Sequence, residues 1–263
     1  MDRIYLDNIS YAALLSLDNG RSTGSGFCIK FEKSFFIVTA KHTLVNSSGN
    51  LRCETLAVTF QNLRETQKSA EIFEFDIRHA GVLFHPKSDV VIVPFGREYD
   101  GRFTAENHVV QIQSGGSDFL KLDIEKSRSF KEIKLANNVF SIGYPTSLLF
   151  TDMSTALPLL RKGIVAGFDV ESNIFIIDSP SYYGNSGSAV LELCEDGILR
   201  LAGVVSRYIP FVVEWKNPRE PTISNTEYLN SGYTICTPID AIRELLYEFG
   251  KNNQPANNDY PTK

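Results

Sequence analysis

The chain has 263 residues, of which 43% are hydrophobic and 22% are charged. This balance can bury a full core and excludes a chain that is disordered by composition, and the length fits one domain of the larger all-β kind. The formal net charge of −5 offers no basic surface for nucleic acid or anionic lipid, so neither a nucleic acid nor a membrane is an expected partner.

The N-terminal segment carries acidic residues and no basic region that would precede a signal sequence. The first apolar stretch, Tyr11–Leu17, is interrupted by Ser16 and is too short for a leader or a membrane span. The cysteines form no CxxC pair and fit no zinc-binding spacing, so we expect reduced thiols, a cytoplasmic protein, no metal and no cofactor. The four are Cys28, Cys53, Cys194 and Cys236.

Short apolar stretches separated by turn residues predict β-strands along most of the chain. The polar, glycine-bearing stretch from Arg97 to Gly116 is interpreted as the connection between two halves. Strands are predicted in the first half at Tyr11–Leu17, Gly26–Phe31, Phe35–Thr39, Leu56–Phe60, Glu71–Phe75, Val82–Phe84 and Val90–Pro94, and in the second at Val139–Gly143, Gly163–Phe168, Ile174–Asp178, Ser188–Leu193, Leu199–Ser206 and Tyr233–Thr237.

One helix is predicted near the C-terminus, over about 238–249. Pro238 suits the first helical turn, apolar residues recur from Ile239 to Phe249 at spacings of three and four, and Gly250 supplies a stop. The remaining segment, 251–263, is polar and is predicted to be a disordered tail.

Three segments place a chemically useful side chain beside an apolar strand. His42 follows a buried strand, Asp89 precedes one, and Ser186 lies between Gly184 and Gly187. A serine hydroxyl needs a histidine to accept its proton as it attacks, and the histidine needs a carboxylate to fix its tautomer. We therefore predict a catalytic triad of His42, Asp89 and Ser186, with the backbone N–H groups of Gly184 and Ser186 as an oxyanion hole. The other histidines, His79, His85 and His108, are interpreted as structural.

Five motifs in order, GSGF (24–27), TAKH (39–42), SDVVIV (88–93), IGYP (142–145) and GNSGS (184–188), resemble the landmarks of trypsin-like, chymotrypsin-fold serine peptidases. In style they are most similar to the HtrA-like and glutamyl-endopeptidase-like branches. The resemblance implies an all-β domain over 10–250, with two six-stranded antiparallel β-barrels and a C-terminal α-helix. The first barrel would span about 10–100 and the second about 117–237. It also implies a serine endopeptidase that hydrolyses protein substrates through an acyl-enzyme.

The same resemblance assigns residues to substrate binding. Ser206 would support the triad by a hydrogen bond to Asp89, and the substrate site would consist of Pro180, Ser181, Ser206, Arg207 and Tyr208. Pro180 stands where trypsin has its specificity acid, which disfavours Arg or Lys as the P1 residue, the one that supplies the scissile carbonyl. Ser181 and Arg207 could favour an acidic P1 residue, but the favoured interpretation is that Arg207 points to solvent. Tyr208 would narrow the entrance.

Two features leave the functional interpretation open. In the trypsins that the chain resembles, a freed N-terminus pairs with an Asp next to the nucleophile, but Asn185 carries no charge for such a pair. Zymogen cleavage is therefore disfavoured, and activity is either constitutive or, as we expect, gated by a regulatory protein partner or a loop. Ser188 and Tyr208 depart from the family pattern, which keeps a catalytically silent scaffold or binding module as the alternative.

The insertion Pro210–Gly232 is either a lid or partner site or a packed loop. A serine at the nucleophile position excludes a cysteine peptidase, and no phosphate-binding GxxxxGK[ST] loop is present.

Overall fold

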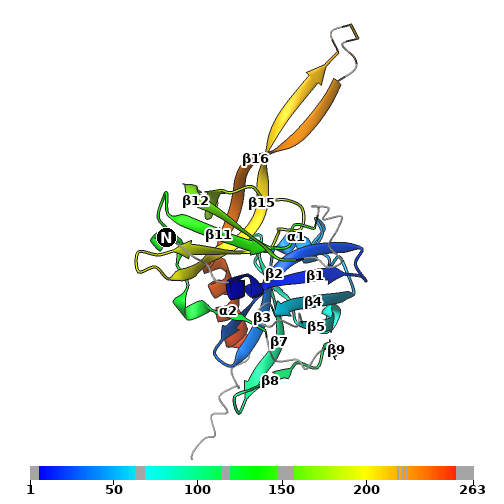
Figure 1. The fold of residues 1–263 in the computed structure, drawn as a ribbon. Helices are drawn as coiled ribbons and strands as arrows, with labels where there is room; N and C mark the ends of the chain where they lie inside the picture. Colours follow the sequence, from blue (N-terminus) through cyan, green and yellow to red (C-terminus); the bar gives the residue numbers. More distant parts are fainter. Residues whose placement is uncertain are drawn as a thin grey trace, which may run out of the picture.

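The computed structural model describes residues 6–62, 69–113, 119–146, 157–217, 219–220, 222 and 224–252. It shows two β-sheet units side by side, followed by one long helix, α2 (Asp240–Asn252) (Figure 1). Of the predicted tail, Lys251 and Asn252 belong to α2 and the rest lies outside the described residues. The shorter helical segments are α1 (Lys41–Leu44), η1 (Leu6–Tyr11), η2 (Ile77–His79), η3 (Ile124–Lys126) and η4 (Phe130–Glu132).

The first unit is an open ten-stranded sheet with the strand order β6-β7-β3-β2-β1-β4-β5-β9, in which β10 pairs with β2 and β8 with β7. The expected first barrel of six strands is therefore wrong. The strands are β1 (Ala12–Leu17), β2 (Ser22–Phe31), β3 (Ser34–Thr39), β4 (Thr55–Asn62), β5 (Ser69–Asp76), β6 (Leu83–Phe84), β7 (Val91–Tyr99), β8 (Arg102–Ala105), β9 (Val109–Gln113) and β10 (Lys121–Asp123).

The reason lies in the stretch predicted to connect the two halves. Residues of this stretch form β8 and β9 instead of an irregular linker. Strand β9 pairs with the edge of β5 that faces away from β4, with Phe75 opposite Val109. A barrel would close only if β7 paired with β5 along this same edge. Each strand has only two hydrogen-bonding edges, so the sheet stays open.

The second unit is a closed antiparallel barrel with the strand order β11-β12-β13-β16-β15-β14. This half agrees with the expected six-stranded barrel. Its strands are β11 (Asn138–Gly143), β12 (Leu159–Asp169), β13 (Ile174–Asp178), β14 (Ala189–Leu193), β15 (Leu199–Lys216) and β16 (Ser224–Pro238).

Three buried apolar clusters fill these units. One lies in the first sheet and contains a group of mutually packed aromatic rings, among them Phe35, Phe73 and Phe95. A second fills the closed barrel around Phe175. The third joins strands of both units to α2, whose Phe249 ring packs edge to face on Phe36 at 4.9 Å between centroids. The third cluster therefore fixes how the two units sit together.

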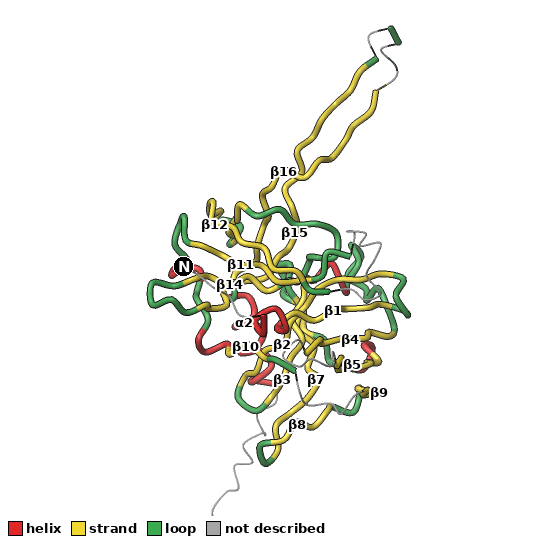
Figure 2. Tube along the Cα trace, viewed as in Figure 1, coloured by secondary structure: helices red, strands yellow, loops and turns green. Residues whose placement is uncertain are grey.

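The insertion predicted as a lid, a partner site or a packed loop is a long hairpin that extends away from the body (Figures 1 and 2). Strands β15 and β16 stay paired from the barrel out to Lys216 opposite Ser224. Several apolar side chains on this arm are exposed, including Phe211 and Trp215, each at 60%. The arm is therefore not a packed loop.

No described helix is both long enough and apolar enough to cross a lipid bilayer.

Candidate active site

His42 lies at the end of a buried strand, where the chain turns sharply. Strand β3 ends at Thr39, whose hydroxyl donates to the Ser25 carbonyl at 2.7 Å, and Ala40 remains extended. The single turn of α1 then begins at Lys41 and presents the His42 side chain at the surface. The buried apolar strand before it thus gives the imidazole a rigid base.

Asp89 lies in the loop that enters β7, and this loop is organised by His85. The His85 Nδ1 atom lies 2.8 Å from the Ser88 N–H, and the His85 N–H donates to the Val90 carbonyl at 3.0 Å. The other ring nitrogen of His85 lies 2.9 Å from a carboxylate oxygen of Glu244 in α2. His85 is therefore structural, as expected, but what it shapes is the loop that carries the acid.

Ser186 lies in a tight turn before β14 that is anchored to the first sheet. The Ser25 N–H donates to the Ser186 carbonyl at 3.0 Å. Gly187 has a φ of +89°, and a Cβ there would come within 2.1 Å of the Ser25 carbonyl oxygen and 2.2 Å of the Thr39 hydroxyl. Only glycine allows this close approach, so the glycine after the serine is what brings the two units together at the site.

These anchors bring the three predicted triad side chains into one hydrogen-bonded row. His42 Nδ1 lies 2.8 Å from Asp89 Oδ2, and His42 Nε2 lies 2.9 Å from Ser186 Oγ. The His42 backbone N–H also donates to Asp89 Oδ1 at 3.0 Å, so both carboxylate oxygens are bound by His42. Both imidazole nitrogens are therefore engaged, one by the acid and one by the hydroxyl.

Asp89 is held in its charged form. Burial by itself would raise the pKa of this carboxyl, but its hydrogen bonds with His42 and Ser206 and the attraction of the imidazole outweigh burial and lower the pKa to about 2. The Ser206 hydroxyl donates to Asp89 Oδ2, the contact that the sequence predicted. An ionised carboxylate at Nδ1 favours the tautomer with its proton on Nδ1, which leaves Nε2 free to accept the Ser186 proton.

Two backbone donors beside the serine are open. Gly184 has a φ of +96°, and its carbonyl accepts from the Ser25 hydroxyl at 2.6 Å, which turns the peptide so that this oxygen points away from the site. Within the described part of the chain, neither the Gly184 N–H nor the Ser186 N–H donates to a protein acceptor. Two unpaired N–H groups next to a nucleophile are suited to stabilise a developing oxyanion.

The residues predicted for substrate binding fall into two groups. Ser181 is buried, and its carbonyl accepts from the Asn230 side chain at 2.5 Å, while Pro180 is half-buried beside it. Tyr208 packs edge to face on the exposed Tyr183 ring at 6.3 Å.

Arg207 belongs to a different part of the site. It is exposed and lines an open cavity of about 480 Å³ together with His42 and Asp89, a cavity to which Pro180 and Ser181 do not contribute. The structure therefore does not bring Arg207 and Ser181 to a common wall.

Ser188, one of the departures from the family pattern, is fully buried. A Cβ on Gly143 would meet the Ser188 hydroxyl at 1.8 Å, so the serine fits because the opposing residue has no side chain. Gly143 on β11 thus supplies the space for the extra hydroxyl, which has no hydrogen-bond partner among the described residues.

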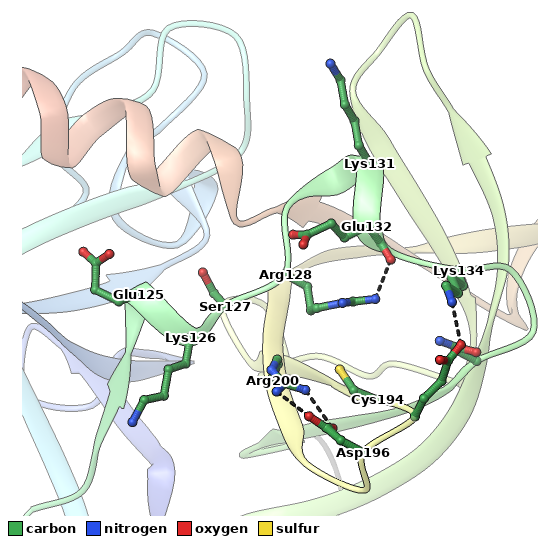
Figure 3. Close-up of a pocket in the computed structure, with 12 residues that line it drawn as sticks. Glu125, Lys126, Ser127, Arg128, Lys131, Glu132, Lys134, Cys194, Asp196 and Arg200 are labelled. Carbon is green, nitrogen blue, oxygen red and sulfur yellow. Dashed lines mark hydrogen bonds and ion pairs between the residues drawn. The ribbon is translucent and has the colours of Figure 1, made fainter.

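A second cavity, of about 620 Å³, lies away from the triad along η3, η4 and the turn between β14 and β15 (Figure 3). Its charges are largely paired, with Lys134 at 2.6 Å from Glu195 and Arg200 at 2.5 Å from Asp196. Among the described residues, no three His, Cys, Asp or Glu side chains gather as they would around a metal ion. Neither observation identifies residues that would hold a cofactor.

Sequence reasoning missed the anchoring roles of His85 and Ser25. The His85-Pro86 dipeptide before the acid was a usable signal. Proline favours a turn, and the ring nitrogen of the preceding histidine can accept a hydrogen bond from a backbone N–H of that turn. Ser25 gave no such signal, since its partners Gly184 and Ser186 are about 160 residues away.

Comparisons with known proteins identify the family and the fold. The sequence model of a trypsin-like peptidase domain matches residues 24–198. Deg5 superposes with a TM-score of 0.52 at 15% identity, covering 90% of this chain and 88% of its own. A serine endoprotease from Yersinia pestis gives 0.52 at 13%, covering 96% and 69%, and human heparin binding protein gives 0.54 at 13%, covering 96% of each chain. At these identities the three structures show a common fold. No curated protein matches the sequence.

Proposed function

Because this chain belongs to the trypsin-like peptidase family, we propose that it is a serine endopeptidase in which His42, Asp89 and Ser186 are the catalytic residues. The single observation that carries the proposal is the row of contacts through the imidazole, 2.8 Å to the acid on one side and 2.9 Å to the hydroxyl on the other. Among the contacts within the described residues, no other serine hydroxyl is hydrogen-bonded to a histidine.

The proposed reaction begins with Ser186 Oγ attacking the scissile carbonyl carbon while His42 Nε2 accepts the hydroxyl proton. The carbonyl oxygen becomes an oxyanion, and the N–H groups of Gly184 and Ser186 are its proposed donors, each worth about 3–4 kcal/mol of transition-state stabilisation. The imidazolium, stabilised by Asp89, then gives its proton to the leaving amine as the C–N bond breaks. Water activated by His42 hydrolyses the acyl-enzyme and restores the serine.

An extended substrate has a place to bind beside the serine. Strand β14 pairs with β15 only as far as Val204, whereas β16 stays paired with β15 beyond this point. In the described part of the chain, the edge of β15 that β14 occupies up to Val204 therefore has no strand partner at Ser206–Tyr208, while the opposite edge is paired with β16. A polypeptide added to this edge would form main-chain hydrogen bonds that are independent of its side chains. This supports protein or peptide substrates over small esters.

Labelling with a fluorophosphonate probe tests the proposal, because the probe reacts only with an activated serine. We expect stoichiometric labelling of the wild type, none in Ser186→Ala, and labelling slowed by at least 100-fold in His42→Ala. Ser188→Ala is the matched control and should label at the wild-type rate, because its hydroxyl is buried against Gly143. A protein that stays unlabelled at saturating probe, both as wild type and with Tyr183 and Tyr208 replaced by alanine, contradicts the peptidase and leaves the silent scaffold.

We also propose that access to the site is gated. Tyr183 directly precedes the proposed oxyanion donor Gly184, and Tyr208 follows Ser206 by two residues on β15. Their rings lie in edge-to-face contact at 6.3 Å between centroids, where they would restrict entry. Opening would require these rings to part, through a protein partner or a loop movement. Purified protein that cleaves peptides at its full rate, with no increase when Tyr183→Ala and Tyr208→Ala are introduced, would contradict gating.

A reducing, cytoplasmic compartment is part of the proposal. All four cysteines are free and buried, and burial raises the pKa of Cys53 to about 11, so its thiol is unreactive at neutral pH. Expression in an oxidising compartment would then leave the thiol count at four, as a thiol titration of the denatured protein would show.

A further inference from the structure

Most of the charged side chains that line one cavity beside the triad are positive. It measures about 480 Å³ and contains Arg207 from β15, Lys87 from the loop before Asp89, and Lys41 next to His42. Among the described residues, the only carboxylate in its lining is Asp89, whose oxygens are already bound by His42 and Ser206. The charge that faces the open space is therefore cationic.

The cations are available to a ligand. Within the described residues, the side chains of Arg207 and Lys87 make no hydrogen bond and no ion pair, and both side chains are exposed. The Lys87 backbone N–H donates to His85 Nδ1 at 3.3 Å, which leaves its ammonium free. Lys41 donates one N–H to the His85 carbonyl at 2.9 Å, and its ammonium lies 5.7 Å from the centroid of the Phe84 ring, so it is held near the loop. Within the described residues no other acceptor binds its remaining protons. A carboxylate entering here would meet at least two unpaired donors.

The register of the proposed substrate strand identifies which side chain enters. Ser186 Oγ lies 3.1 Å from the Ser206 carbonyl, so the substrate residue opposite Ser206 is the one that supplies the scissile carbonyl, P1. Both neighbours of β15 in the barrel run antiparallel to it. If the substrate strand is also antiparallel to β15, each step toward the C-terminus of β15 faces a residue one step closer to the N-terminus of the substrate. The residue opposite Arg207 is then P2, which directly precedes P1. Side chains directly opposite each other point to the same face of a sheet.

From these observations, and resting on the proposed peptidase function, we propose that Arg207, Lys87 and Lys41 form a subsite that selects an acidic residue at P2 of the substrate. The Arg207 guanidinium gives the carboxylate a planar pair of donors, and the two lysines add charge behind it. This differs from the expectation that Arg207 acts with Ser181 on P1, because the two residues line different parts of the site.

The test compares peptides that differ only at P2. Once a cleavage profile has fixed a suitable P1 residue, matched peptides carrying Glu, Gln or Lys at P2 are hydrolysed by wild type, Arg207→Glu and Lys87→Gln. For the wild type we expect kcat/KM to be about tenfold higher for Glu than for Gln. Lys87→Gln should reduce this Glu-to-Gln ratio. Arg207→Glu should bring the ratio below one and make the peptide with Lys at P2 the best substrate. Raising the salt concentration should lower the wild-type ratio toward one, because the rim is open to solvent.

Arg102→Glu is the matched control, since it makes the same change of net charge on the exposed strand β8, far from the cavity, and should leave the Glu-to-Gln ratio unchanged. A wild-type ratio near one, or an equal loss of preference in Arg102→Glu, overturns the proposed subsite. The two proposals fail separately. Binding of the same peptides to Ser186→Ala, followed by fluorescence anisotropy, reports the P2 preference without turnover. A protein that never labels with fluorophosphonate contradicts only the peptidase.

Discussion

At the scale of single residues, the catalytic row is held by unequal burial. The Asp89 side chain is 27% exposed and the His42 side chain 48% exposed, so the acid is shielded while the imidazole can still meet a substrate. Ser206 closes the far side of the carboxylate. The result is an acid that remains charged through the whole neutral range and a base that is oriented by it.

The lowered pKa of Asp89 predicts a pH-dependent stability. Its folded-state pKa is about 2, below the ordinary value of about 3.9, so ionised Asp89 stabilises the native state fully above pH 4 and this contribution is lost as the pH falls toward 2. We expect the advantage in unfolding free energy of wild type over Asp89→Asn to shrink by roughly 1 kcal/mol between pH 7 and pH 3. Urea unfolding followed by circular dichroism measures it, and an advantage that is constant or grows on acidification argues against the assigned hydrogen bonds.

At the scale of elements, the loop from His85 to Val90 determines where the acid sits. His85→Ala would free the Ser88 N–H and release the link to Glu244 in α2. We expect kcat to fall by about 10–100-fold with little change in KM, because a displacement near 1 Å misaligns the base without altering the substrate edge. The measurement is steady-state kinetics on a cleaved peptide, well below the melting temperature. His85→Asn, whose side-chain oxygen can replace Nδ1 as acceptor, should recover part of the loss; equal activity in all three proteins would show that the loop does not depend on His85.

The projecting arm is a second element with a separable role. Phe211 lies opposite Leu229 on one face of the hairpin, and none of the three core clusters includes a residue from the arm. Pro210 is paired with Asn230, so replacing residues 211–229 by Asn-Gly should close the hairpin with a two-residue turn and keep the Asn230 bond to the Ser181 carbonyl.

For this shortened protein we expect a melting temperature within about 2 °C of wild type and an unchanged rate of fluorophosphonate labelling. Calorimetry and the labelling assay decide the matter. A fall of more than about 5 °C would mean that the arm stabilises the barrel through contacts that its exposed side chains do not suggest.

At the scale of the whole molecule, the cluster that joins both units to α2 predicts cooperative unfolding. Leu245 of α2 is 1% exposed in this cluster, and Leu245→Ala should cost about 2–5 kcal/mol of unfolding free energy while leaving one transition. Leu135→Ala, at a position that is 62% exposed, should cost almost nothing. Circular dichroism should be the probe, because the single tryptophan, Trp215, is 60% exposed on the arm and does not sense the core. Two separate transitions would show that the units unfold independently.

From the sequence by itself, local signals determined that most of the chain forms strands, the position of α2 within about three residues, and the three side chains that meet in the triad row. Alternating apolar residues indicated the strands, apolar residues at spacings of three and four indicated the helix, and glycines around a serine indicated the nucleophile turn. The helix ends were displaced, because Pro238 is the last residue of β16 and Gly250 lies inside α2. The six-stranded barrel that the structure closes was implied by the family resemblance.

Only the tertiary structure decided that the first sheet is open and that the insertion is a projecting hairpin. It also decided that Arg207 lines the cavity beside His42 and does not share a wall with Ser181. Each of these depends on which strand edge or cavity a segment reaches. Edge pairing between β5 and β9, and the contacts of Ser25 with Gly184 and Ser186, join residues that are far apart in the chain. Local propensity carries no record of such partners, because the free energy that selects them comes from burial and hydrogen bonding between distant segments.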